Sequence, residues 1–154
     1  MWLPKASWVG LSLGSSGMAT GTDMIQIDGT AKKAYDKVSS GYQYPSTDTS
    51  DDLTATFTDV DSANTYVLIE RDLDTNDAQD YVIPTDTEFT IGWAVLTTSS
   101  TMTSQHNRDG SFKKTICTRN CTSGGKGGAE VPGAATTTLA GSLCVAASLA
   151  LLAF

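Results

Sequence analysis

Residues that commonly act as nucleophiles or metal ligands are scarce in this chain. The 154 residues include one histidine, His106, and three cysteines. A lone histidine excludes a bis-histidine site within one copy, and nucleophilic catalysis would require a partnered Ser or Cys and an acidic residue. The sequence contains no Gly-x-Ser-x-Gly elbow. The sequence therefore gives no indication of a hydrolase, and we expect a binding domain rather than an enzyme.

Basic residues are also few, with 10 Lys and Arg against 17 Asp and Glu and a formal net charge of -7. Nucleic-acid binding needs a basic stripe to contact phosphates, so no nucleic-acid partner is expected. The acidic residues gather in segments 48–52 and 72–80. These segments lack the Asp/Asn/Gly spacing of a calcium-binding EF-hand loop, and we interpret them as solvated loops.

Long helical patterns are missing, because Leu and Glu are sparse before residue 139 while Thr, Ser, Gly and Asp are abundant. This composition is typical of short strands joined by tight turns. About seven such strands indicate an all-β sandwich. Thr30–Val38 fits either a helix or a strand. The other expected strands are Trp8–Leu13, Asp23–Asp28, Leu53–Thr58, Tyr66–Arg71, Glu88–Leu96 and Ser111–Cys117.

The C-terminal residues 139–154 form an uncharged apolar tail. A Gly/Thr-rich linker, residues 122–138, precedes the tail, so that the folded domain is expected over residues 1–121. Small residues, a spacer and a terminal apolar run are typical of a signal for a glycosylphosphatidylinositol (GPI) anchor, with Gly127 as the expected attachment site. A single transmembrane helix is the alternative if residues 134–138 are included. Both interpretations predict a domain attached to a membrane at the cell surface.

Features near residue 120 fit an extracellular glycoprotein. Cys117 and Cys121 could form a disulfide, while Cys144 lies in the apolar tail. Asn120 begins an Asn-x-Thr sequon for glycosylation. Residues 1–5 contain no apolar signal segment, although an anchored chain must enter the secretory route. We therefore expect the sequence to begin inside the domain.

Five blocks in order resemble the DOMON domain, a module of secreted redox proteins. The most specific is Glu70–Tyr81, which is similar to an Arg-x-Leu-x-Thr-x-Asp-x-x-Asp signature. The other blocks are Trp8–Leu11 with a Gly-rich loop, Met18–Asp23, Tyr35–Gly41 with Pro45 and Asp48, and Trp93–Ala94 with His106 and Gly110. The resemblance covers residues 8 to 116 and implies an immunoglobulin-like β-sandwich. Family members carry one or two strands before the first block, which implies that these are missing here.

The resemblance also implies a cofactor. Haem-binding family members hold the iron between a methionine and a histidine, which by position are Met18 and His106. Such a site implies non-covalent haem b and electron transfer to a redox partner. Met102 is a rival ligand near His106, whereas Met24 is expected in the core. The alternative is a surface module that binds a sugar or a protein and has no redox role.

Two further expectations concern packing. Trp8 and Trp93 lie on expected strands, and we expect them to pack in the core; the alternative is that their rings line a haem or stack on a sugar. Arg71 is expected to brace a turn through an ion pair with Asp77 or Asp80, because the block around it is a structural signature of the resembled family.

Overall fold

A computed structural model describes residues 1–116, and in this range the chain is all-β. The strands form two antiparallel sheets, which confirms the predicted sandwich. Their bounds are β1 Trp2–Pro4, β2 Trp8–Leu13, β3 Asp23–Asp28, β4 Lys33–Val38, β5 Ser46–Thr47, β6 Thr54–Asp59, β7 Asn64–Glu70, β8 Glu88–Leu96 and β9 Arg108–Thr115.

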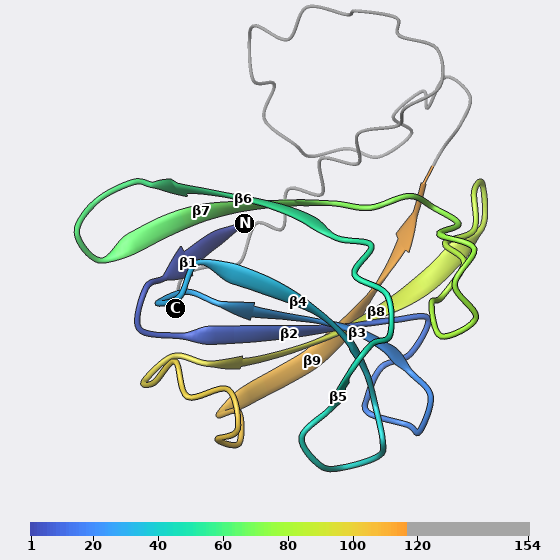
Figure 1. Ribbon diagram of the computed structural model, residues 1–154, viewed down its shortest axis with the longest axis horizontal. Coiled ribbons are helices and arrows are strands. Elements are labelled where there is room, and N and C mark those ends of the chain that lie inside the picture. Colours follow the sequence, from blue (N-terminus) through green and yellow to red (C-terminus); the bar gives the residue numbers. More distant parts are fainter. Residues whose placement is uncertain (117–154) are drawn as a thin grey trace, which may run out of the picture.

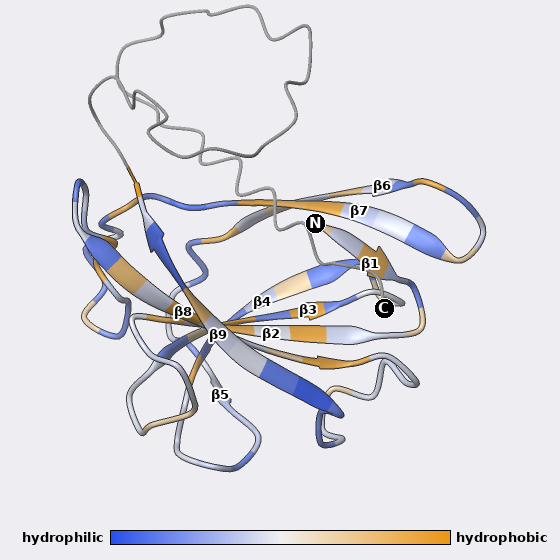
Figure 2. Cartoon of the chain, turned by 180° about the vertical axis from the view of Figure 1, so that it is seen from behind, coloured by the Kyte–Doolittle hydropathy of each residue, from blue (hydrophilic) through white to orange (hydrophobic). Residues whose placement is uncertain are grey.

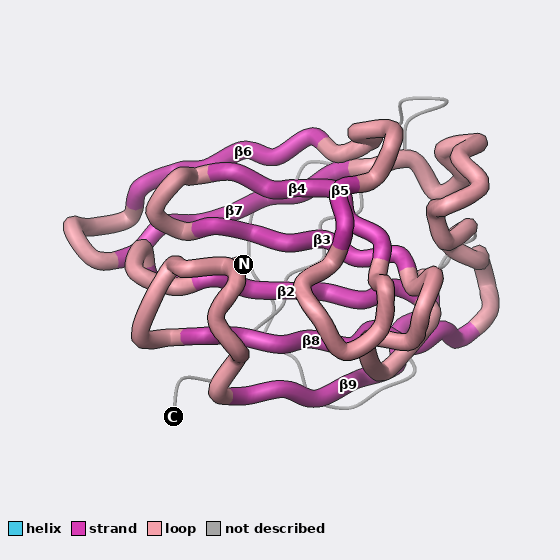
Figure 3. Tube along the Cα trace, turned by 60° about the horizontal axis from the view of Figure 1, so that its bottom comes forward, coloured by secondary structure: helices cyan, strands magenta, loops and turns pink. Residues whose placement is uncertain are grey.

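The two sheets differ in size. The smaller has the order β1-β7-β6, and the larger has the order β5-β4-β3-β2-β8-β9. Figure 1 shows the smaller sheet above the larger one, and Figure 3 shows β4, β3, β2, β8 and β9 side by side. The β2–β3, β4–β5 and β8–β9 loops lie on the side of the larger sheet that faces away from the smaller sheet (Figure 1). The larger sheet therefore has a core face and a face beneath loops.

Alternation along the central strands separates these two faces. In β2, Val9 and Leu13 belong to the buried core, whereas Trp8, Gly10 and Ser12 line a cavity on the other face. Successive strand side chains point to opposite faces, so this pattern follows from the sequence period of two. Figure 2 shows hydrophobic segments on β2 and β7, and hydrophilic colour at the end of β9.

The N-terminal residues were not predicted as structured, yet they complete the smaller sheet. Trp2–Pro4 pairs with β7, and the Met1 ammonium donates a hydrogen bond of 2.7 Å to the Val67 carbonyl oxygen. Leu3 is buried in the core. The expectation that the first strand begins at Trp8 was therefore wrong, because a three-residue strand containing a proline carries almost no periodic signal.

The structure also corrects the predictions for three other strands. The ambiguous segment Thr30–Val38 contains strand β4, whose register with β3 leaves Asp36 opposite Ile25. The last strand begins at Arg108 rather than Ser111 and pairs with β8 along its whole length. The two-residue strand β5 was missed.

Several predictions fall on residues that the structure does not describe. The disulfide between Cys117 and Cys121, the glycan at Asn120, the anchor site at Gly127 and the tail 139–154 all lie beyond residue 116. Within residues 1–116, no helix has the length and apolarity needed to cross a membrane.

Candidate functional site

A cavity of about 680 Å³ lies on the loop-covered face of the larger sheet. Cavities of about 300–1,000 Å³ are the size that binds small molecules and cofactors. Its walls come from strands β2, β3 and β8 and from the three loops on this face. Among the residues singled out in the sequence, the walls include Met18, Met102 and His106, together with part of Trp93. The cavity thus contains both of the predicted iron ligands.

Small residues form the floor of the cavity. Gly10 lies opposite Gln26 and Ala94 in neighbouring strands, and Ser12 lies opposite Gly92. A Cβ atom at Gly92 would be 2.3 Å from Ser12 Oγ, so no larger residue fits there without a shift. A central sheet normally presents larger side chains, and their replacement by glycine and alanine hollows this face.

The loop that carries Met18 is fixed by serine hydroxyls. Ser12 Oγ donates to the Ser15 carbonyl oxygen at 2.9 Å, and Ser39 Oγ donates to the Met18 carbonyl oxygen at 3.1 Å. Gly21, at the end of the same loop, has a φ of 79°, a left-handed conformation that favours glycine. The backbone around Met18 is therefore held against β2 and against the end of β4.

The loop that carries His106 is fixed from the cavity floor. The Gln26 Nε2 amide donates to the Met102 carbonyl oxygen at 3.2 Å, and the Asn107 amide donates to the Val95 carbonyl oxygen at 3.0 Å. The imidazole of His106 meets the Trp8 ring edge-on, with ring centroids 6.5 Å apart and planes at 85°. Trp8 thus packs in the sheet and also contacts the predicted iron ligand.

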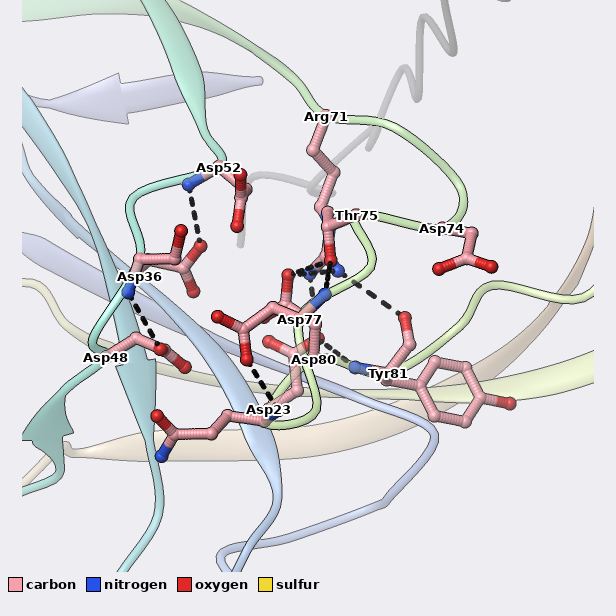
Figure 4. A network of polar contacts seen from close by, with 12 residues as sticks. Asp23, Asp36, Asp48, Asp52, Arg71, Asp74, Thr75, Asp77, Asp80 and Tyr81 are labelled. Carbon is pink, nitrogen blue, oxygen red and sulfur yellow. Dashed lines mark hydrogen bonds and ion pairs between the residues drawn. The ribbon is translucent and has the colours of Figure 1, made fainter.

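A second cluster of polar residues lies on the core face of the same sheet, at its edge. Asp23, Asp36 and Asp80 surround Arg71, and we call this group the carboxylate cluster (Figure 4). Arg71 Nη1 is 2.7 Å from Asp23 Oδ2, and Nη2 is 3.0 Å from Asp80 Oδ2. All three paired side chains are at most 5% exposed. The Arg71–Asp80 pair confirms one predicted partner, whereas Asp77 instead accepts a hydrogen bond from the Gln79 amide.

The cluster contains more negative than positive charge. Burial, together with the smaller effects of the Asp80 and Asp23 charges, raises the pKa of Asp36 to about 7. Burial also raises the pKa of Asp23, although Arg71 and the Tyr81 amide oppose that shift. We assign the charged form to Asp23, whose Oδ2 accepts hydrogen bonds from Arg71 and from the Tyr81 amide. We assign the proton to Asp36, which forms no ion pair within residues 1–116 and feels the Arg71 charge only weakly. The three carboxylates lie within 4.8 Å of one another, so they could alternatively hold a cation.

The sequence predicted some members of these sites and missed others. Met18, Met102 and His106 were singled out and do line one cavity, and Met24, which was expected in the core, lines it too. The floor residues Gly10, Ser12 and Gly92 were not predicted to have a role. The sequence signal for these floor residues would have been a set of small residues on one face of strands whose other residues are large and apolar. Asp36 was missed because its burial depends on the neighbouring loop 71–81.

The fold is a two-sheet antiparallel sandwich with a cavity on one outer face of the larger sheet. The family model of the DOMON domain matches residues 3–96, more than half of the chain. The chain therefore belongs to the DOMON domain family. Neither the curated proteins nor the solved structures include a match.

Proposed function

We propose that this DOMON domain binds haem b between Met18 and His106 and carries single electrons. The supporting observation is that these two side chains, from the β2–β3 and β8–β9 loops, line the same cavity. The residues suit the cofactor in two further ways. The floor at Gly10 and Gly92 has no side chains. The Trp8 indole offers a flat apolar surface at the cavity wall.

The donor set suits electron transfer rather than oxygen chemistry. Haem, when bound, supplies a one-electron couple between ferric and ferrous iron. The Met18 thioether is a soft ligand that favours the ferrous state and raises the potential, while the His106 imidazole binds both states. Met18 and His106 would together hold the iron and would leave oxygen no place to bind to it. The hydrogen bonds that fix the loops around Met18 and Met102 would hold Met18 and His106 in place while the iron changes oxidation state.

The test is a titration of the purified full chain, in mild detergent, with hemin. We expect a six-coordinate reduced spectrum in the wild type that is lost in Met18→Ala and in His106→Ala. Met102→Ala is the matched control, since Met102 also lines the cavity. Absence of haem uptake by the wild type would refute the proposal. A spectrum that disappears in Met102→Ala but persists in Met18→Ala would reassign the sulfur ligand.

The second candidate function is binding of a sugar, and one feature at the cavity wall favours it. Tyr42 is 94% exposed and Tyr44 43% exposed, and both line the cavity. Exposed aromatic faces stack on sugar rings. A glycan array tests this candidate, with Tyr42→Ala as the variant expected to lose binding. Haem uptake together with a blank array would exclude a sugar, and binding of a protein partner would then be tested by pull-down.

We also propose that residues 139–154 direct attachment of the domain to the outer face of the cell membrane, with Gly127 as the anchor site. The support is the sequence pattern alone, a small-residue site followed by a spacer and an apolar run. Treatment of expressing cells with a phosphatidylinositol-specific phospholipase should release the domain. A protein that stays on the cells after treatment would instead indicate a transmembrane helix, and retention of full-length protein inside the cells would contradict both arrangements.

A further inference from the structure

The surroundings of His106 differ at its two ring nitrogens. Nδ1 lies 3.4 Å from Asp109 Oδ1, whereas Nε2 makes no hydrogen bond among residues 1–116. The His106 side chain is 29% exposed and rests edge-on against the Trp8 ring. A carboxylate thus stands beside one nitrogen only.

Asp109 is well placed to act on that nitrogen. It lies opposite Ala94 in the β8–β9 pair, and Ala94 lies opposite Gly10 on the cavity floor. It is the one carboxylate among the cavity-lining residues of segment 1–116. Its side chain is 67% exposed, so little packing opposes the small movement that would shorten 3.4 Å to a normal hydrogen bond of about 2.9 Å.

We propose that Asp109 is a positioning residue that accepts a hydrogen bond from Nδ1–H of His106 and so leaves Nε2 as the iron-binding nitrogen. The hydrogen bond at one imidazole nitrogen decides which nitrogen carries the proton and which is free to bind a metal. Histidine ligands generally donate their second N–H to a carboxylate, a carbonyl or water, which also fixes the ring orientation. This inference rests on the proposed haem function, but its first test does not need haem.

The first test is the tautomer of His106 in the haem-free full chain. His106 is the only histidine, so its ¹⁵N and ¹³C NMR signals need no further assignment. The spectra are taken at alkaline pH, where imidazole is neutral. We expect mainly the Nδ1–H form in the wild type, loss of that preference in Asp109→Ala and its recovery in Asp109→Glu. Asp51→Ala is the control, since Asp51 is exposed and lies outside the cavity.

The second test is the reduction potential of the haem-loaded chain. A carboxylate that accepts from Nδ1–H makes the imidazole more electron-rich and favours ferric iron. Asp109→Ala should therefore shift the ferrous-to-ferric ratio up to about tenfold toward ferrous, which corresponds to about 59 mV. Asp109→Glu should restore the wild-type potential, and Asp51→Ala should not alter it.

The outcomes separate the two proposals. A wild-type His106 that is mainly the Nε2–H form, or a tautomer and potential that are the same in Asp109→Ala as in the wild type, would overturn the role of Asp109. A wild-type chain that shows the Asp109-dependent tautomer but takes up no haem would overturn the haem function and leave the Asp109–His106 contact established.

Discussion

The cavity and the carboxylate cluster occupy opposite faces of one sheet, and β3 contributes alternately to both. Asp23 belongs to the cluster and Ile25 to the core, while Met24 and Gln26 line the cavity. The cluster is closed, charged and held by short ion pairs. The cavity has a single carboxylate among its described lining residues. From this difference we infer that the cluster stabilises the sandwich and that the cavity is the candidate ligand site.

Arg71→Met is the change expected to have the largest effect. It leaves Asp23 and Asp80 buried without their cation, and breaking a buried pair by removing one partner costs about 3–5 kcal/mol of unfolding free energy. Urea unfolding followed by tryptophan fluorescence measures the loss. The control is Lys32→Met, whose partner Asp59 is exposed and screened by solvent. Equal midpoints for the two variants would refute a stabilising role of the cluster.

Asp36→Asn should stabilise the domain at neutral and alkaline pH, in contrast to Arg71→Met. The folded-state pKa of Asp36, about 7, lies above its ordinary value of 3.8. The folded state therefore binds this proton more tightly than the unfolded state does. The stabilisation that the bound proton contributes is complete below pH 3.8 and is lost as pH rises toward 7. The neutral amide should remove that pH dependence and raise the unfolding free energy near pH 8 by about 2–4 kcal/mol.

Thermal unfolding between pH 4 and pH 8 checks this sign. Asp51→Asn is the matched control, because Asp51 is exposed and lies outside the cluster. A wild type that is equally stable across this range would show that Asp36 is ionised at a normal pKa. A variant less stable than the wild type at pH 8 would show that the carboxylate itself is required.

Gly92→Ala tests the cavity floor with a smaller expected effect. The new methyl group would lie 2.3 Å from Ser12 Oγ and 3.0 Å from the Ser15 carbonyl oxygen, where the Met18 loop begins. Overpacking of this kind costs about 1–3 kcal/mol. Gly17→Ala, with no atom within 4 Å of the new Cβ, is the control. In chemical denaturation, Gly92→Ala should be less stable than Gly17→Ala. Equal stabilities of the two variants would mean that the loop shifts at no cost in free energy.

The sequence predicted the central strands more accurately than the edges. Strands Trp8–Leu13, Asp23–Asp28 and Glu88–Leu96 have the predicted bounds, because alternating or apolar runs between turn residues report strand structure directly. Short strands such as Trp2–Pro4 form only through pairing with distant residues, which no local pattern records. Their formation is a tertiary effect.

The candidate site, like the set of strands, was only partly predictable from the sequence. Met18 and His106 were singled out by family resemblance, and the structure brings both to one cavity. The burial of Asp36 could not be read from its neighbours in sequence, because the loop residue Asp80 and Arg71 lie far along the chain. Their convergence depends on how the two sheets pack.

The smallest stability effect is expected at the proposed ligands themselves. Met18 and His106 lie in loops at the wall of an open cavity, and both are only half-buried. Truncation of side chains outside a packed core usually changes the unfolding free energy by about 0.5 kcal/mol or less. Met18→Ala and His106→Ala should therefore unfold like the wild type without haem, although both should lose haem binding. Urea unfolding with and without hemin measures both properties on the same samples. Loss of more than about 2 kcal/mol without haem would mean that these side chains support the fold, so that an effect on haem would no longer identify them as ligands.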